Sequence, residues 1–387
     1  MTWEKEVKDI KKRQELSLKH GGEESVKIHH KKGRKTLRER LLIILDDGSF
    51  QEVGKIAGDA EYDENGELKD FTPANFLLGF GKINKRSVII GGEDFTMKGG
   101  SPNPSGLRKS IYTEELALKY KIPLVRLHEG GGGSVAGSGG TAKKPTVPSG
   151  DAVFSKNRFQ ALAQCLGTIP VATAALGPVA GLPAARLVAS HFSVMTKNSQ
   201  VLIAGPAVVK RALGIDITKE DLGGPNVHLK SGAVDNLAED EDDALNQIKI
   251  FLSYLPNNYL ELPSKKETKD KRNRIENELL TIIPKERRKT YDVRKLLSLI
   301  LDFNSFFEYG KYYGSSLITG LATLDGQPVA VLANDCRIYA GAMTATASIK
   351  LRRFIDFVNT FNVPVLSFVD EPGFMIGPDS EKAGTIR

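Results

Sequence analysis

The chain repeats itself at a constant offset of 241 residues, and this repeat limits the possible folds more than any other feature of the sequence. Residues 81–133 align with residues 322–374 without a gap. The identical pairs are Val88 and Val329, Asp94 and Asp335, Gly100 and Gly341, Lys109 and Lys350, Pro123 and Pro364, and Gly132 and Gly373. Six identities alone could arise by chance, but the Gly, Lys and Pro positions share one ungapped register. That agreement favours a duplicated unit.

Short apolar runs alternate with helix-like stretches inside each copy. Residues 87–90 and 123–127 predict strands, and residues 114–120 between them predict a helix. The same order recurs in the second copy as strand, polar turn, Lys-bearing helix, X-Pro and apolar strand. Alternation of strand and helix predicts a mostly parallel sheet covered by helices. The fold class is therefore α/β.

The repeat also suggests domain boundaries. We expect an N-terminal helical segment at 1–49, a first domain at 50–256, a connecting segment at 257–291 and a partial second domain at 292–387. The offset places the counterpart of residue 181 at position 422, past residue 387. We therefore expect the second domain to be truncated before its half of a site is complete.

The N-terminal segment carries an apolar stripe and the densest basic run of the chain. Nine basic residues lie between Lys27 and Arg40, and they supply much of the net charge of +7. Such a run could bind a polyanion or a nucleotide-bearing cofactor, or it could be the solvated face of an amphipathic helix. No aromatic residue separates the basic ones, so we expect no nucleic-acid partner and favour the solvated face. The apolar stripe comprises Leu37, Leu41, Leu42 and Leu45.

Composition, with 40% hydrophobic and 26% charged residues, is that of a soluble globular protein, and the presence of only two cysteines favours an intracellular, reducing compartment. No apolar run approaches the ~20 residues of a membrane span, so we expect no membrane partner. The acidic residues near the start argue against a signal or transit peptide. Cys165 and Cys336 cannot supply a disulfide framework, and no His pair has metal-binding spacing, so we expect no metal. The compartment would be the cytoplasm in a bacterium and the mitochondrial matrix in a eukaryote.

A run of glycines follows the predicted strand at 123–127. Residues 129–140 read EGGGGSVAGSGG, which is typical either of a flexible linker or of a loop where backbone approaches a ligand. No Gly-Lys-Ser/Thr follows, which excludes a P-loop. Because the preceding strand and acid recur in the second copy, we favour a ligand-facing loop.

Residues 171–185 form a second segment of interest. A strand of small residues leads to Gly177-Pro178, which predicts a turn, and then to a helix that starts at Pro183. Backbone N–H groups at such a turn can stabilise an oxyanion, but close strand–helix packing explains the composition equally well. The sequence shows no nucleophile elbow and no Cys/His arrangement. An enzyme built on this chain would therefore act through backbone dipoles and a reactive cofactor.

Several motifs resemble the carboxyltransferase (β) subunits of biotin-dependent acyl-CoA carboxylases, of the propionyl-CoA and methylcrotonyl-CoA carboxylase type. The resemblance runs in order along essentially the whole chain. The matching motifs are KKGRKTLRER at 31–40, LDDGSFQE at 45–52, DFT at 94–96 with GGS at 99–101, DLGG at 221–224 with His228, FLSYLP at 251–256, and VDEPGF at 369–374.

The resemblance implies two tandem crotonase-like domains of the ClpP/crotonase superfamily. It implies transfer of a carboxyl group from carboxybiotin to the α-carbon of an acyl-CoA, with the enolate oxygen held by backbone N–H groups. In this family biotin is carried by a partner subunit or domain. The expected partners are therefore an acyl-CoA, a biotin carboxylase or biotin carrier subunit, and further copies of this chain.

The resemblance also assigns residues. Gly181 and Leu182 stand where the family has the Gly-Gly pair of the first, catalytic oxyanion hole. The acyl-CoA side corresponds to Gly131, Gly132, Gly133 and Ser134, and the biotin side to Gly373 and Phe374. The chain departs from the family in three ways: the Leu182 side chain, the lack of an Arg after the glycines, and Thr344 in place of an Asp.

Two other functions remain open. One is a biotin-dependent acyl-CoA decarboxylase of the same superfamily, which runs the chemistry in reverse. The other is a non-catalytic subunit that binds acyl-CoA or supports an assembly, which the expected truncation and the altered glycines favour. The sequence does not select one acyl-CoA, because that choice depends on the shape of a pocket.

Overall fold

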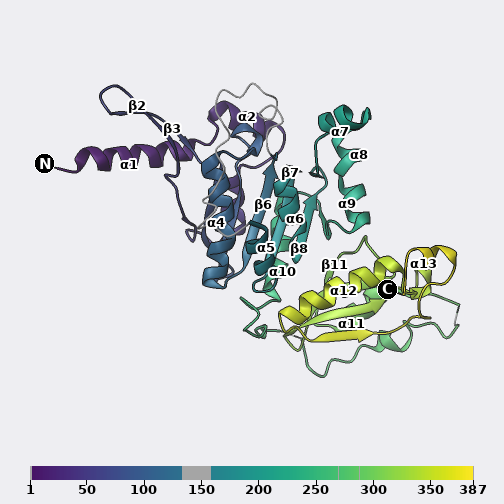
Figure 1. Cartoon of the computed structure of the whole chain (residues 1–387). Coiled ribbons are helices and arrows are strands. Elements are labelled where there is room, and N and C mark those ends of the chain that lie inside the picture. The colour runs from purple at the N-terminus through teal and green to yellow at the C-terminus, as the bar shows by residue number, and fades with distance from the viewer. Residues whose placement is uncertain (1, 133–157, 269, 287, 387) are drawn as a thin grey trace. The chain divides into compact units, whose positions relative to one another are not determined.

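The chain forms two units (Figure 1), and each contains one antiparallel hairpin of apolar strands from one copy of the repeat. The computed structural model describes residues 2–132, 158–268, 270–286 and 288–386. The first unit comprises residues 1–225 and 238–249, and the second comprises residues 226–237 and 250–387.

The first unit is built on a mostly parallel sheet in the order β1-β4-β5-β6-β7-β8, with β9 paired to β7. The strands up to residue 238 are β1 (Gln51–Glu52), β2 (Gly58–Tyr62), β3 (Leu68–Pro73), β4 (Phe76–Ile83), β5 (Arg86–Glu93), β6 (Leu124–Gly130), β7 (Val171–Ala180), β8 (Phe192–Thr196), β9 (Gln200–Leu202) and β10 (Asn236–Ala238). Strands β5 to β8 pair in parallel, and β2 and β3 form a separate hairpin. The predicted parallel sheet is confirmed.

Helices cover this sheet, with α4 packed on β4 and β5 and α6 packed on β6 and β7. The helices up to residue 253 are α1 (Glu4–Leu16), α2 (Glu23–Lys31), α3 (Leu37–Ile44), α4 (Pro104–Tyr120), α5 (Arg158–Leu166), α6 (Leu182–Val188), α7 (Pro206–Leu213), α8 (Lys219–Gly223), α9 (Pro225–Ser231) and α10 (Glu241–Ser253), with the 3-10 turns η1 (Ser17–Lys19) and η2 (Lys98–Gly100). Across the described ranges, no helix is both long and apolar enough to cross a membrane.

Helix α3 shows where the predicted apolar stripe fails. The helix begins at a capping box, in which Thr36 and Glu39 each accept a hydrogen bond from the other's backbone N–H. Its buried residues are Leu37, Arg40, Leu41 and Ile44. Leu42 is 77% exposed, so its place in the stripe was wrong. The buried face of α3 includes Arg40 instead, because the Arg40 guanidinium pairs with the buried carboxylates of Glu129 and Glu241.

The second unit has a four-stranded sheet in the order β11-β12-β13-β14. Its elements are η4 (Asn277–Leu280), α11 (Val293–Ile300), β11 (Phe307–Tyr309), β12 (Leu317–Leu324), β13 (Gln327–Asn334), η5 (Tyr339–Gly341), α12 (Ala345–Thr360), β14 (Val365–Phe368) and α13 (Pro378–Lys382). β12 and β13 are antiparallel, and β14 joins β13 in parallel, as β6 joins β5 in the first unit. The core between α11 and this sheet includes Leu297, Ile318 and Val331.

The structure confirms the duplication at the level of single hydrogen bonds. The hairpin β12–β13 begins and ends at the repeat offset from β4–β5. In the first unit the Asp46 carboxylate accepts hydrogen bonds from the N–H groups of Asn84 and Lys85 at the hairpin turn. In the second unit Asp302 does the same for Asp325 and Gly326.

A buried lysine also recurs in both units beside an Arg–Glu pair. Lys109 donates to Gly54 O at 3.2 Å next to Glu52, which binds Arg38 at 2.9 Å. Lys350 donates to Leu317 O at 2.7 Å, and Glu308 pairs with Arg294 in that unit. Burial, aided by the charge of Arg294 and opposed by that of Glu308, lowers the pKa of Lys350 to about 8.

The buried Lys350 predicts an alkaline rise in stability. Below pH 8 its ammonium group stays charged in the fold at a cost, whereas the unfolded chain keeps its proton up to pH ~10.4. Between these values the native state binds fewer protons, so the free energy of unfolding should rise with pH, by roughly 3 kcal/mol for this group. Urea unfolding of the second unit at a series of pH values would measure this rise.

In Lys350→Met, most of the rise in the free energy of unfolding with pH should be lost. A smaller rise should remain, because burial also lowers the pKa of Lys266 to about 8. Lys311→Met, at an exposed position of the same unit, is the control and should keep the full profile. Equal slopes in the wild type and Lys350→Met would contradict the assignment.

Candidate functional site

The glycine segment, residues 130–132, leaves the sheet at the end of β6 and is held by a turn that precedes α4. Gly131 N–H donates to Gly99 O at 3.0 Å, and Ser101 Oγ donates to Gly132 O at 3.0 Å. Of the residues expected on the acyl-CoA side, Gly131 and Gly132 are therefore fixed by hydrogen bonds to residues 99 and 101. Gly133 and Ser134 lie outside the described residues.

The turn that holds the glycine segment has an unusual backbone. Lys98, Gly99 and Gly100 all have positive φ, of 53°, 62° and 69°. A Cβ atom on Gly100 would lie 2.6 Å from Glu129 O, so only glycine allows this close approach. A run of left-handed residues is costly and marks a turn that its surroundings hold in place.

Gly181 meets the glycine segment from the other side. It precedes α6 with φ 66° and ψ −125°, and a Cβ atom placed on it would lie 3.1 Å from Gly132 Cα. The backbones of Gly132 and Gly181 therefore touch, and we refer to this contact as the glycine junction. The structure thus brings two residues from the two predicted segments together.

The predicted turn at Gly177-Pro178 is wrong. Both residues lie within β7, which runs to Ala180 and changes partner along its length. Residues 172–175 pair with β8, whereas residues 178–180 pair with β9. β7 stays extended through Gly177-Pro178 because it has a parallel partner strand both before and after these residues. The turn follows at Gly181.

The N–H groups at this turn have different uses. Gly181 N–H donates to Leu202 O at 3.0 Å, which fixes the turn to β9. Leu182 N–H lies at the first position of α6, and Pro183, which follows, has no N–H. Leu182 N–H therefore belongs to the first turn of α6, where the helix itself supplies no acceptor.

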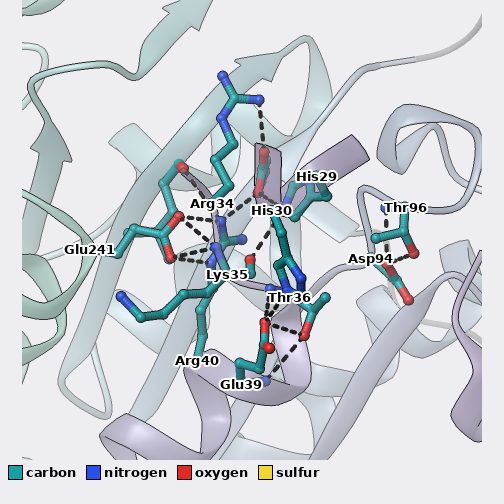
Figure 2. Close-up of polar contacts among 12 residues, drawn as sticks. His29, His30, Arg34, Lys35, Thr36, Glu39, Arg40, Asp94, Thr96 and Glu241 are labelled. Atoms are coloured by element: carbon teal, nitrogen blue, oxygen red, sulfur yellow. Dashed lines mark hydrogen bonds and ion pairs between the residues drawn. The ribbon is translucent and has the colours of Figure 1, made fainter. Parts of the chain in front are cut away.

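A buried ion cluster lies beneath the glycine segment. Glu129, the residue before it, is fully buried and binds Arg40 at 2.5 Å, Arg34 at 3.1 Å and His29 at 3.4 Å. Arg40 also binds both oxygens of Glu241, at 2.7 and 2.9 Å. Figure 2 shows Lys35 and Arg40 next to Glu241, which accepts hydrogen bonds from the Lys35 N–H and from the Arg40 guanidinium.

This cluster corrects the expected role of the basic run. His29 and Arg40 are 4% and 1% exposed, so they do not belong to a solvated helical face. Burial alone would raise the pKa of Glu129, but the hydrogen bond from His29 and the charge of Arg40 lower it. The positive charge of Arg40 is likewise retained, because its carboxylate partners outweigh the cost of burial and raise its pKa.

Residues 20–21, near the start of the chain, bond to residues 94–96, which precede the turn at 98–100. His20 Nδ1 lies 2.7 Å from Asp94 Oδ2, and Thr96 donates to the other carboxylate oxygen through both its N–H and its hydroxyl. Burial opposes ionisation of Asp94, but the bonds from His20 and Thr96 lower its pKa. Gly21 N–H donates to Thr96 Oγ1 at 2.9 Å, which ties residues 20–21 to the turn.

Sequence reasoning missed a second buried layer around β6. His128 pairs with Glu93 at 3.1 Å, and Glu114 of α4 pairs with Arg126 and with Arg186 of α6. Burial opposes ionisation of Glu93, but the charge and hydrogen bond of His128 lower its pKa. The available signal was the placement of charged residues inside a strand that is buried on both faces, where each charge needs a partner.

The second unit has a corresponding turn. Met343 N–H donates to Gly373 O at 3.0 Å, and Met375 N–H donates to Met343 O at 2.9 Å. Gly341 approaches Asp370 O as Gly100 approaches Glu129 O, at the repeat offset. Gly373 has φ 118°, and Phe374 is 57% exposed. Thr344 caps α12, so this departure from the family motif has a structural role.

Comparisons with known proteins agree on one family. Residues 28–387 match the model of the carboxyl transferase domain. The chain is 33% identical to the carboxyltransferase subunit of propionyl-CoA carboxylase from Haloferax mediterranei, over 100% of this chain and 73% of that protein. It is also 33% identical to methylmalonyl-CoA decarboxylase subunit alpha from Veillonella parvula, over 95% of this chain and 70% of that protein.

Solved structures agree as well. The hexameric core of transcarboxylase 12S, with methylmalonyl-CoA and methylmalonic acid bound, superposes with a TM-score of 0.86 at 30% identity, over 100% of this chain and 74% of that chain. A single-chain, multi-domain long-chain acyl-CoA carboxylase shares the fold, with a TM-score of 0.80 at 24% identity, over 99% of this chain and 38% of that chain.

The glycine junction predicts which substitutions the site tolerates. Gly181→Ala should lower the free energy of unfolding by about 1–3 kcal/mol, because an L residue is strained at this φ and its Cβ would press on Gly132. Chemical denaturation would measure the loss. Gly131→Ala is the control, since its Cβ would lie 3.8 Å from Gly99 O, an ordinary contact. A loss for Gly131→Ala as large as that for Gly181→Ala would contradict the described junction.

Proposed function

This chain belongs to the carboxyl transferase family and is an acyl-CoA carboxyltransferase, and from that premise we propose that its glycine junction is the acyl-CoA half of the active site. The observation that supports this is the contact of Gly132 with Gly181 beside the Leu182 N–H. The junction joins the two segments in which the sequence predicts substrate contact and an oxyanion hole.

The chemistry needs a hydrogen-bond donor at the thioester oxygen. Removing the α-proton of an acyl-CoA places negative charge on that oxygen, and a preorganised N–H stabilises it. Leu182 N–H is such a donor in this proposal, and it lies at the start of a helix, where the backbone dipoles add a partial positive charge. Gly181 contributes by holding the turn through its bond to Leu202.

The acyl-CoA chain would lie along the glycine segment, where the absence of side chains lets the ligand approach the backbone. We assign Gly131 and Gly132 to this contact, together with Gly133 and Ser134. The Leu182 side chain is half-buried at the junction and adds an apolar surface near the acyl group.

The second substrate is carboxybiotin, carried by a biotin-bearing partner subunit. When bound, it supplies CO2 and a base for the α-proton. We assign Gly373 and Phe374 to this side, because the turn exposes an apolar ring next to a glycine with open space around it. The domains at 50–256 and 292–387 would each contribute one half-site, within an oligomer of this chain.

A decarboxylase is a second candidate, favoured by the match to the methylmalonyl-CoA decarboxylase subunit. Both candidates require the same enolate, so the glycine junction serves either direction. The direction in which the full assembly works separates them.

Carboxyl transfer can be measured without a partner subunit by using free biotin as the acceptor. We expect the full chain to convert methylmalonyl-CoA to propionyl-CoA in a biotin-dependent manner, measured by chromatography of the two CoA esters. Reactions with malonyl-CoA and methylglutaconyl-CoA would rank the acyl groups. Binding of acyl-CoA without any transfer would instead identify a non-catalytic subunit and reject the proposal.

The Leu182 N–H can be tested without disturbing the turn. Leu182→Pro removes this N–H at a helix position that accepts proline, and we expect kcat to fall about 10²–10³-fold. Leu182→Ala keeps the N–H and should leave kcat within a fewfold of the wild type. Equal kcat values for the two variants would show that the Leu182 N–H is not the oxyanion donor.

A further inference from the structure

One guanidinium group joins three distant parts of the first unit. Arg40 of α3 is 1% exposed and binds Glu129 at the end of β6 and Glu241 at the start of α10. Its Nη2 atom also lies 3.4 Å from Leu176 O of β7. These contacts span sequence separations of 89, 201 and 136 residues.

Both carboxylate oxygens of Glu129 have cationic partners, and β7 packs against the same carboxylate. Arg34 binds its Oε1 atom, whereas Arg40 and His29 bind its Oε2 atom. A Cβ atom on Gly177 would lie 2.5 Å from Oε1, so β7 also packs directly against the carboxylate. Because the glycine segment follows Glu129 directly, fixing this side chain fixes the origin of that segment.

The described part of the second unit has different residues at the positions of Arg40 and Glu129. Arg38 and Glu52 recur as Arg294 and Glu308, at an offset of 256, and the same offset matches Arg40 with Leu296 of α11. The repeat offset of 241 matches Glu129 with Asp370. Asp370 is exposed and accepts a hydrogen bond from Tyr291 Oη at 2.7 Å. The Arg–Glu pair is therefore common to both units, whereas the cluster of Arg40 with Glu129 and Glu241 is found in the first unit and not in the described part of the second.

We propose that Arg40 is a positioning residue that, through Glu129, holds the 130–132 backbone against Gly181 and so sets the geometry of acyl-CoA binding. This proposal rests on the proposed function for its effect on catalysis. Its structural part, the hold on the glycine segment, stands on the ion cluster alone.

Hydrogen–deuterium exchange of the full chain tests the structural part. Arg40→Lys keeps the charge but cannot bind two carboxylates through one planar guanidinium. We expect amide exchange in peptides covering 128–132 to become about tenfold faster, because the opening of this segment loses a charge-assisted hydrogen bond. The KM for methylmalonyl-CoA should rise about tenfold, with a smaller change in kcat. Should Arg40→Lys fail to fold, Glu129→Gln keeps the side-chain shape and carries the same expectation.

Arg38→Lys is the matched control, because it alters an ion pair on the same helix that joins Glu52 rather than the glycine segment. It should leave exchange at 128–132 and the KM unchanged. Equal exchange in Arg40→Lys and Arg38→Lys would overturn the proposal, as would faster exchange with an unchanged KM. A wild type that transfers no carboxyl group would reject the proposed function, and the exchange comparison would still decide the role of Arg40.

Discussion

The first unit depends on the pairing of Glu129 with Arg40. A buried carboxylate without a partner is too costly to remain ionised in a protein interior, and so is a buried guanidinium. Here the two groups form an ion pair with each other. Glu241 is a second partner of Arg40, and Arg34 and His29 are further partners of Glu129. Because these groups come from the N-terminal segment, β6 and α10, satisfying the charges fixes three separate parts of the chain around one point.

The site that results is made of backbone. The turn at 98–100, the glycine segment and the turn at Gly181 contribute main-chain groups, and the charged side chains lie beneath them. This arrangement suits a reaction whose difficult step is the build-up of charge on a thioester oxygen, since fixed N–H dipoles stabilise such charge without reorganising. The ion cluster therefore lies beneath the backbone groups that we propose as the acyl-CoA site.

Duplication separates what the fold needs from what the site needs. The hairpins, the left-handed turns at 98–100 and 339–341, the aspartates that cap the hairpin turns and the buried lysines occur in both units. Arg40 and Glu129 are replaced by Leu296 and Asp370. Two units with one frame can thus carry different polar interiors, as two half-sites for different ligands would require.

The sequence by itself determined the repeat, the order of strands and helices and the two glycine-bearing segments, because these follow from local periodicity and from residues with special backbone freedom. It did not determine that Leu42 faces solvent, that Gly177-Pro178 continues a strand, or that His29 and Arg40 are buried. Those outcomes depend on partners up to 201 residues away, which no local pattern encodes. Only the tertiary structure, by bringing Gly132 to Gly181 above a neutralised ion cluster, decided that the two segments form one junction.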